Sequence, residues 1–281
     1  KLYGDMGDWP NEGKLSALNI RRACDASLRR MQTDYIDLYQ MHHVDRATPW
    51  DEIWEAMEYL KQQGKILYVG SSNFAGWHLA QGQEAANRRG VLGLVSEQSI
   101  YNLVERTVEL EVLPAAQAYG IGIIPWSPLH GGLLGGILRK QAEGDVKRST
   151  SGRAADTLEQ HRAAIEQWEA FCDERGEAPG DVALAWLLHQ PAVTAPIVGP
   201  RTMGQLDSAL AALDVRLDEA ALARAGRGQL RHGPADREGT GPRGRGQRGL
   251  ARVGEHARLG RHAAGRGHRV HLLGVLLGGL G

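Results

Sequence analysis

Five groups of polar or aromatic residues in this 281-residue sequence stand where an apolar segment ends, and their side chains could carry chemistry. Imidazoles can transfer protons near neutral pH, amides can bind another amide, and a guanidinium can bind a phosphate. Residues that follow the carboxyl ends of parallel strands meet at one edge of the sheet and can form a site there. The groups are His42-His43, Ser71-Ser72-Asn73, Glu97-Gln98, Trp126-Ser127 and Gly199-Pro200-Arg201.

Apolar segments alternate with amphipathic segments along the first 224 residues, which predicts strands and helices in turn. We expect strands at 35–41, 66–69, 91–96, 121–126 and 192–198, and a short strand at 1–3. We expect helices at 17–31, 49–63, 75–87, 106–119, 158–175, 181–189 and 202–213, with a polar loop at 138–156. Ser16 is placed to cap the first helix, and Gly64 to end the second.

This alternation predicts an α/β protein built of parallel βαβ units, with helices over the sheet. No Gly-x-Gly-x-x-Gly follows a predicted strand, which favours a (β/α)8 TIM barrel over a dinucleotide-binding sheet. Because eight strands are needed, we expect an incomplete barrel whose first two strands, and part of the third, are absent. The sequence begins at Lys1 without Met, and we interpret it as cut there.

The composition excludes several classes of protein. With 42% hydrophobic and 23% charged residues, most of the chain can bury a core. No apolar run reaches about 18 residues, so we expect no membrane-spanning helix. The two cysteines, Cys24 and Cys172, cannot make a disulfide scaffold. We expect both to be reduced core residues and the protein to be cytoplasmic.

The zero formal net charge hides two unlike parts. Residues 225–281 contain 11 Arg, no Lys and 3 acidic residues, a net charge of +8, whereas residues 1–224 carry −8. We therefore divide the chain into a partial barrel, 1–224, and an Arg/Gly-rich tail, 225–281. The tail has 16 Gly and no aromatic residue, which predicts either disorder or a segment translated out of frame. Without aromatic residues to stack on bases, we do not expect nucleic acid as a partner.

Five motifs in residues 1–224 together resemble the aldo-keto reductases, and the branch with bacterial general aldehyde and sugar reductases and potassium-channel β-subunits in particular. The motifs are Asp-Leu-Tyr-Gln-Met-His-His (37–43), Gly-Ser-Ser-Asn-Phe (70–74), Glu-Gln-Ser-Ile-Tyr-Asn (97–102), Pro-Trp-Ser-Pro-Leu (125–129) and Pro-Ile-Val-Gly-Pro-Arg (196–201). The resemblance implies reduction of a small-molecule aldehyde or ketone to an alcohol, with NADPH as cofactor, on a (β/α)8 barrel.

The resemblance implies two catalytic residues, Lys1 and His42, which would polarise the family's proton-donating tyrosine. That tyrosine and an aspartate belong to the first two strands, so we expect this chain to be impaired and its parent to be active. His43 stands where the family often has a tryptophan. The substrate stays open between sugars, aromatic aldehydes and quinone-like compounds.

The resemblance also implies a set of cofactor-binding residues. Amide and hydroxyl groups would bind the nicotinamide carboxamide, an aromatic ring would stack on the nicotinamide, a loop would line the pyrophosphate, and a guanidinium would favour the 2′-phosphate of NADPH. The residues for the carboxamide are Ser72, Asn73 and Gln98, and the stacking ring is Trp126. The loop on the pyrophosphate comprises Ser127, Pro128, Leu129, His130 and Gly131, with Arg148 reaching over it. The residues for the 2′-phosphate are Gly199, Arg201 and Gln205. Ser208 and Ala209 depart from the usual adenine-binding pair.

Alternatives remain beside this interpretation. One is an NADPH-binding regulatory module that resembles the β-subunits and lacks strong catalysis; a homo-oligomer is compatible with either function. His42, His43 and Asp45 have a spacing that metal sites use, but neighbouring strand residues point to opposite faces, so we expect no metal. Glu97 beside Gln98 is interpreted as an exposed carboxylate.

Overall fold

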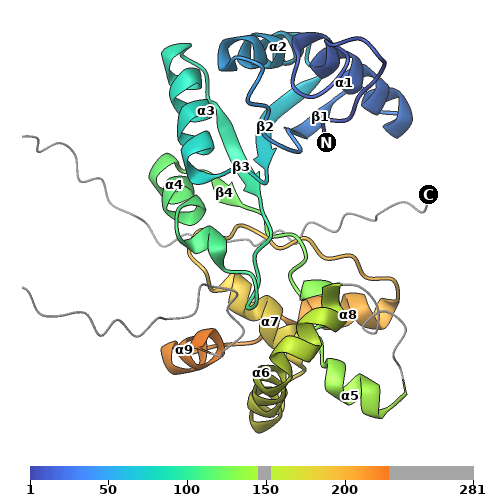
Figure 1. Ribbon diagram of the computed structural model, residues 1–281, viewed down its shortest axis with the longest axis vertical. Coiled ribbons are helices and arrows are strands. Elements are labelled where there is room, and N and C mark those ends of the chain that lie inside the picture. Colours follow the sequence, from blue (N-terminus) through green and yellow to red (C-terminus); the bar gives the residue numbers. More distant parts are fainter. Residues whose placement is uncertain (145–152, 228–281) are drawn as a thin grey trace, which may run out of the picture. The chain divides into compact units, whose positions relative to one another are not determined.

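The computed structural model describes residues 1–144 and 153–227, and the expected tail from residue 228 onward lies outside them. In these residues four parallel strands form one sheet in the order β1-β2-β3-β4 (Figure 1). The strands are β1 (Ile36–Gln40), β2 (Ile66–Ser72), β3 (Leu94–Gln98) and β4 (Gly122–Ile123). The sheet is not closed within the described part of the chain, which agrees with the incomplete barrel that the sequence predicts.

One helix follows each of the first strands, as parallel connections require. The helices are α1 (Ala17–Met31), α2 (Trp50–Gln62), α3 (Gly76–Arg88), α4 (Val112–Tyr119), α5 (Ile137–Ala142), α6 (Arg153–Arg175), α7 (Pro179–Leu188), α8 (Met203–Ala211) and α9 (Glu219–Arg227), with short 3-10 turns at Thr107–Glu109 and His130–Gly132. None of these helices is both long and apolar enough to cross a membrane.

Single β-bridges extend the sheet at both sides. Leu2 pairs in parallel with Met41 beside β1, and Val193 pairs with Ile123 beside β4. The expected strand at 1–3 is therefore present as one bridge. The expected strand at 192–198 is wrong in length, because Val193 and Val198 form only isolated bridges and the residues between them make no continuous strand. Together the four strands and two bridges make six neighbouring strand positions.

Packing follows the apolar stripes of the helices. α2 buries Ile53, Trp54, Met57 and Leu60 against the sheet side, and α1, α2, α3 and α4 pack in succession. Ser16 caps α1 through the backbone N–H of Asn19 at 3.2 Å, as predicted. Cys24 and Cys172 are both buried and unpaired, and burial raises the pKa of the Cys172 thiol to about 12. A reactive thiolate at either position is therefore disfavoured.

β2 and β3 are close together, and the register of their pairing shifts by one residue. Val69 pairs with Leu94 but Gly70 pairs with Ser96, so Val95 is an extra residue on β3. A Cβ on Gly70 would lie 2.5 Å from the Ser96 hydroxyl, which explains the glycine. Beyond this β-bulge the pairing continues to the carboxyl ends of both strands.

Candidate active site

The carboxyl ends of the strands bring Lys1 and His42 to one place. The backbone N–H of His42 donates to the carbonyl oxygen of Leu2 at 2.8 Å, next to the bridge between Leu2 and Met41. Lys1 then extends beside the end of β2, where its ammonium donates to the hydroxyl of Ser72 at 2.9 Å. The two residues that resemblance marks as catalytic are thus held by adjacent strand positions.

Ser72 is fully buried and joins three parts of the site. Its hydroxyl accepts hydrogen bonds from Lys1 Nζ and from Asn73 Nδ2 at 3.0 Å, and it donates to the carbonyl oxygen of Gln98 at 2.9 Å. One donor and two acceptors are the full capacity of a hydroxyl. In this structure the three bonds use that capacity, and the expected bond from Ser72 to a nicotinamide carboxamide stays a prediction.

Asn73 is exposed and has a left-handed backbone, with φ of +58°. Its side-chain oxygen accepts a hydrogen bond from Trp126 Nε1 at 3.0 Å, and its amide nitrogen faces the carbonyl oxygen of His42 at 3.4 Å. These bonds fix the edge of the Trp126 indole against the strand ends. Asn73 and Trp126, which the resemblance assigned to one nicotinamide, are brought together. Gln98 lies beside them and is largely buried.

The two histidines stack on each other. The ring centroids of His42 and His43 are 4.5 Å apart, and Tyr3 meets His43 edge-on at 5.2 Å. The expectation that these imidazoles point to opposite faces is wrong, because the chain leaves the strand after Met41. Asp45 does not join them: its carboxylate accepts from the hydroxyl of Thr48 and from backbone N–H groups. Within the described residues no group of three or more metal-binding side chains occurs.

Partial burial acts on both catalytic candidates. Burial lowers the pKa of the Lys1 ammonium, and the negative charge of Glu97 opposes that shift. Burial also lowers the pKa of His42, and the charges of Lys1 and His43 lower it further. Both shifts favour the uncharged form of the group concerned.

Glu97 differs most from its sequence interpretation as an exposed carboxylate, because its side chain is fully buried. It accepts hydrogen bonds from the hydroxyls of Ser71 and Ser99 and from the backbone N–H of Phe74 at 3.2 Å. Burial raises the pKa of Glu97, and these hydrogen bonds oppose the rise. The sequence carries no signal for this burial, because Ser71, one of the partners of the carboxylate, lies on another strand 26 positions away.

The loop after Trp126 folds back on itself. Ser127 and His130 have positive φ, and Asn102 donates to the carbonyl oxygen of Ser127 at 2.9 Å. The N–H groups of His130 and Gly132 donate to carbonyl oxygens within the loop, so these atoms are occupied in this conformation. His130 and Pro128 are both buried, and their place beside a pyrophosphate stays a prediction. Leu129 is half-buried and Gly131 is exposed.

The start of α8 presents the remaining predicted residues. Thr202 caps the helix by accepting from the backbone N–H of Gln205, and the Gln205 side chain in turn accepts from the N–H of Arg201 at 2.7 Å. Arg201 is exposed, and nothing lies within 4 Å of a Cβ built on Gly199. Ser208 donates to Asp181 of α7 rather than standing open for an adenine. Arg148 lies outside the described residues.

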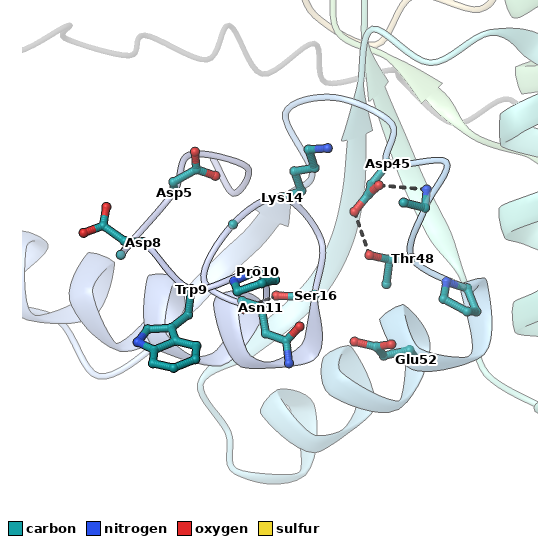
Figure 2. A pocket seen from close by; sticks show the side chains of 14 residues that line it. Asp5, Asp8, Trp9, Pro10, Asn11, Lys14, Ser16, Asp45, Thr48 and Glu52 are labelled. Carbon is teal, nitrogen blue, oxygen red and sulfur yellow. Dashed lines mark hydrogen bonds between the residues drawn. The ribbon is translucent and has the colours of Figure 1, made fainter.

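A cavity of about 610 Å³ lies away from these residues, between the 5–16 and 45–52 segments (Figure 2). Asp5, Asp8 and Glu52 line it together with Trp9, which is 77% exposed. In the described residues none of the predicted cofactor-binding side chains lines this cavity. The cavity therefore does not identify the predicted cofactor site.

An open sheet of parallel strands, with polar side chains at its carboxyl ends, defines part of a barrel enzyme. The chain belongs to the aldo/keto reductase family, whose model matches residues 1–226, and the family's (β/α)8 barrel accounts for the six-position arc. The family relationship and the fold class predicted from the sequence are confirmed.

Curated relatives support the assignment. Over 223 residues the chain is 51% identical to "Uncharacterized oxidoreductase YrpG" of Bacillus subtilis, covering 78% of this chain and 67% of that protein. It is 35% identical to "Versiconal hemiacetal acetate reductase" of Aspergillus parasiticus, covering 75% and 62%. It is 31% identical to "Probable voltage-gated potassium channel subunit beta" of rice, Oryza sativa subsp. japonica, covering 74% and 66%. The chain thus spans about two thirds of the length of these relatives.

Proposed function

We propose that this protein is an oxidoreductase that reduces aldehydes or ketones to alcohols with NADPH as the hydride donor. The observation that carries the proposal is the chain of hydrogen bonds from Lys1 through Ser72 and Asn73 to Trp126. It connects a cation suited to a carbonyl oxygen with an amide and an aromatic ring suited to a nicotinamide. The family and the reductase among the relatives agree with this chemistry.

The residues present fit a nicotinamide nucleotide. The exposed amide of Asn73 has the donor and acceptor types that a carboxamide binds, and the half-buried Trp126 ring is fixed at its edge. Open space stands beside Gly132 and Gly199, where a Cβ would meet no atom within 4 Å. Exposed Arg201 at the start of α8 offers a guanidinium and a helix N-terminus, both favourable for a phosphate. We assign the nicotinamide to Trp126 and Asn73 and the 2′-phosphate to Arg201.

When bound, the nucleotide would supply the hydride. Lys1 and His42 would hold the carbonyl oxygen at the strand ends, where the Lys1 ammonium stabilises the negative charge that develops on that oxygen. Ser72 keeps the ammonium in place, and His43 and Tyr3 form an aromatic wall beside His42.

The first experiment is a titration of the purified chain with NADPH, followed by quenching of tryptophan fluorescence. Saturable quenching in the wild type, strongly reduced in Trp126→Phe, is the expected result. Trp9→Phe is the matched control, because Trp9 lies on the distant cavity and should leave the titration unchanged. Absence of saturable NADPH binding by the folded wild type would overturn the proposed function. Slow consumption of NADPH with an aldehyde would then establish the reaction.

A further inference from the structure

Glu97 is a fully buried carboxylate that contacts the segment on which the site is built. Its oxygens accept from Ser99 Oγ at 2.6 Å, from the hydroxyl of Ser71, and from the backbone N–H of Phe74 at 3.2 Å. Ser71 and Phe74 flank Ser72 and Asn73 in the chain. The carboxylate therefore binds both ends of the turn that carries the two polar residues of the site.

The turn needs such support because it is strained and exposed at its tip. Asn73 has φ of +58°, a left-handed conformation that is uncommon outside glycine, although asparagine adopts it more readily than most residues. The N–H of Asn73 donates to the carbonyl oxygen of Gln98 at 3.2 Å, and its side chain holds Trp126. A shift of this turn would move the Asn73 amide, the Trp126 indole and the partner of Lys1 together.

We propose that Glu97 is a positioning residue: from the neighbouring strand β3 it holds the Ser71–Phe74 turn so that Asn73 and Trp126 are aligned for the nicotinamide. Glu97 touches neither substrate nor cofactor in this role. It acts through Phe74 and Ser71 on the two residues between them. The part of the proposal that concerns the nucleotide rests on the proposed function, whereas the alignment of Asn73 and Trp126 does not.

The test compares two substitutions that each shorten a buried side chain by one methylene. Glu97→Asp withdraws the carboxylate from the N–H of Phe74. Gln83→Asn is the matched control, because Gln83 is 7% exposed and bonds the backbone of Leu92 and Leu94 at the opposite end of β3. Glu97→Gln is the rescue variant, since an amide oxygen can still accept from Phe74 and an amide nitrogen can donate to Ser71.

Two readouts separate alignment from general stability. The first is the NMR resonance of the Trp126 indole N–H without any nucleotide, assigned by its loss in Trp126→Phe. We expect Glu97→Asp to shift it and both Glu97→Gln and Gln83→Asn to leave it in place. The second is the dissociation constant for NADPH, which we expect to rise about tenfold in Glu97→Asp, equivalent to roughly 1.4 kcal/mol, and to stay near wild type in the other two variants.

Each outcome either supports or overturns the positioning role of Glu97. A wild-type Trp126 resonance in folded Glu97→Asp would overturn the proposal, and so would an equal shift in Gln83→Asn, since the effect would then be general loosening of β3. If the resonance behaves as expected but the wild type binds no NADPH, the positioning role stands and the proposed function fails. If Glu97→Asp does not fold, an altered Trp126 resonance in folded Glu97→Gln would count against the proposal, because that variant retains the hydrogen bonds.

Discussion

Trp126 and Asn73 are 53 positions apart in the chain, yet the indole Nε1–H donates to the Asn73 side-chain oxygen across 3.0 Å. The bond crosses from the segment after β4 to the turn after β2. It leaves Asn73 with a left-handed backbone and sets the direction of the aromatic ring. Because this hydrogen bond depends on the positions of both segments, it is a measure of the geometry of the whole site.

Substitutions at Asn73 separate backbone strain from the side-chain contact. Asn73→Gly removes the amide but suits the positive φ, whereas Asn73→Ala removes the amide and keeps the strain. We expect both variants to bind NADPH more weakly, and only the alanine variant to lose about 1 kcal/mol in free energy of unfolding. Urea denaturation and fluorescence titration measure the two effects. Equal stability of the glycine and alanine variants would contradict the strain argument.

Ser72→Ala removes three hydrogen bonds at once from a buried position. The carbonyl oxygen of Gln98 loses its hydroxyl donor, and the Lys1 ammonium loses its acceptor. We expect a loss of about 1–3 kcal/mol in the free energy of unfolding, since buried polar partners are left unpaired. Ser27→Ala is the control, because the half-buried Ser27 hydroxyl bonds groups of its own helix α1, donating to the carbonyl oxygen of Ala23 and accepting from Arg30. Similar losses in both variants would refute the special role of Ser72.

The titration of His42 should respond to Lys1. Partial burial, and then the Lys1 charge, lower the pKa of His42 below its usual 6.5 or so. We expect Lys1→Gln to raise the pKa of His42 without restoring it fully, since burial remains. NMR titration of the imidazole measures this shift. An unchanged pKa in Lys1→Gln would show that the two side chains do not interact in solution.

The same lowered pKa predicts how stability depends on pH. A folded-state pKa below the unfolded value means that protonation of His42 disfavours the folded state. The penalty is complete below the folded pKa and is relieved as pH rises toward about 6.5. Stability should therefore increase with pH across that window. We expect His42→Asn to flatten this increase in thermal melts taken at each pH, and an identical pH profile would contradict the assignment.

Arg201 should determine the choice between the two nicotinamide nucleotides. Its exposed guanidinium stands at the start of α8, with Thr202 as the cap. We expect Arg201→Ala to weaken NADPH binding by about tenfold and to leave NADH binding unchanged, because only NADPH has the 2′-phosphate. Arg216→Ala, at another exposed position, is the control. A parallel loss for NADPH and NADH would remove Arg201 from the phosphate site.

Strong periodicity explains which elements could be predicted from the sequence. The helix at 17–31 coincides with α1, and the helix at 49–63 differs from α2 by one residue at each end. The strand at 121–126 was predicted too long: Pro125 has no N–H for a ladder, and β4 keeps only Gly122–Ile123. The loop at 138–156 was wrong at both ends: buried Ile137 starts α5 directly after Gly136 in a left-handed conformation, and α6 begins at Arg153.

The candidate site also has features that could be predicted from the sequence and features that could not. The positions of His42, Asn73 and Trp126 at one edge followed from strand ends, which the sequence marks by apolar runs, whereas Lys1 was implied by the family resemblance alone. The bonding of Ser72 and the burial of Glu97 did not, because a hydroxyl or a carboxylate looks the same in sequence whether it faces solvent or a neighbouring strand. Only the pairing of β2 with β3 decides that difference.

The extra residue Val95 has a consequence for that pairing. In an uninterrupted strand Leu94 and Glu97 would face opposite sides, since side chains alternate. With Val95 inserted, Leu94 pairs with Val69 and Glu97 pairs with Ser71, so both belong to the same side of the sheet. Val95 thus determines which side of the sheet each later residue of β3 faces. Without this extra residue, the Glu97 carboxylate and the Gln98 side chain would exchange sides. An apolar residue without any reactive group therefore decides which side of the sheet each of two adjacent polar side chains faces.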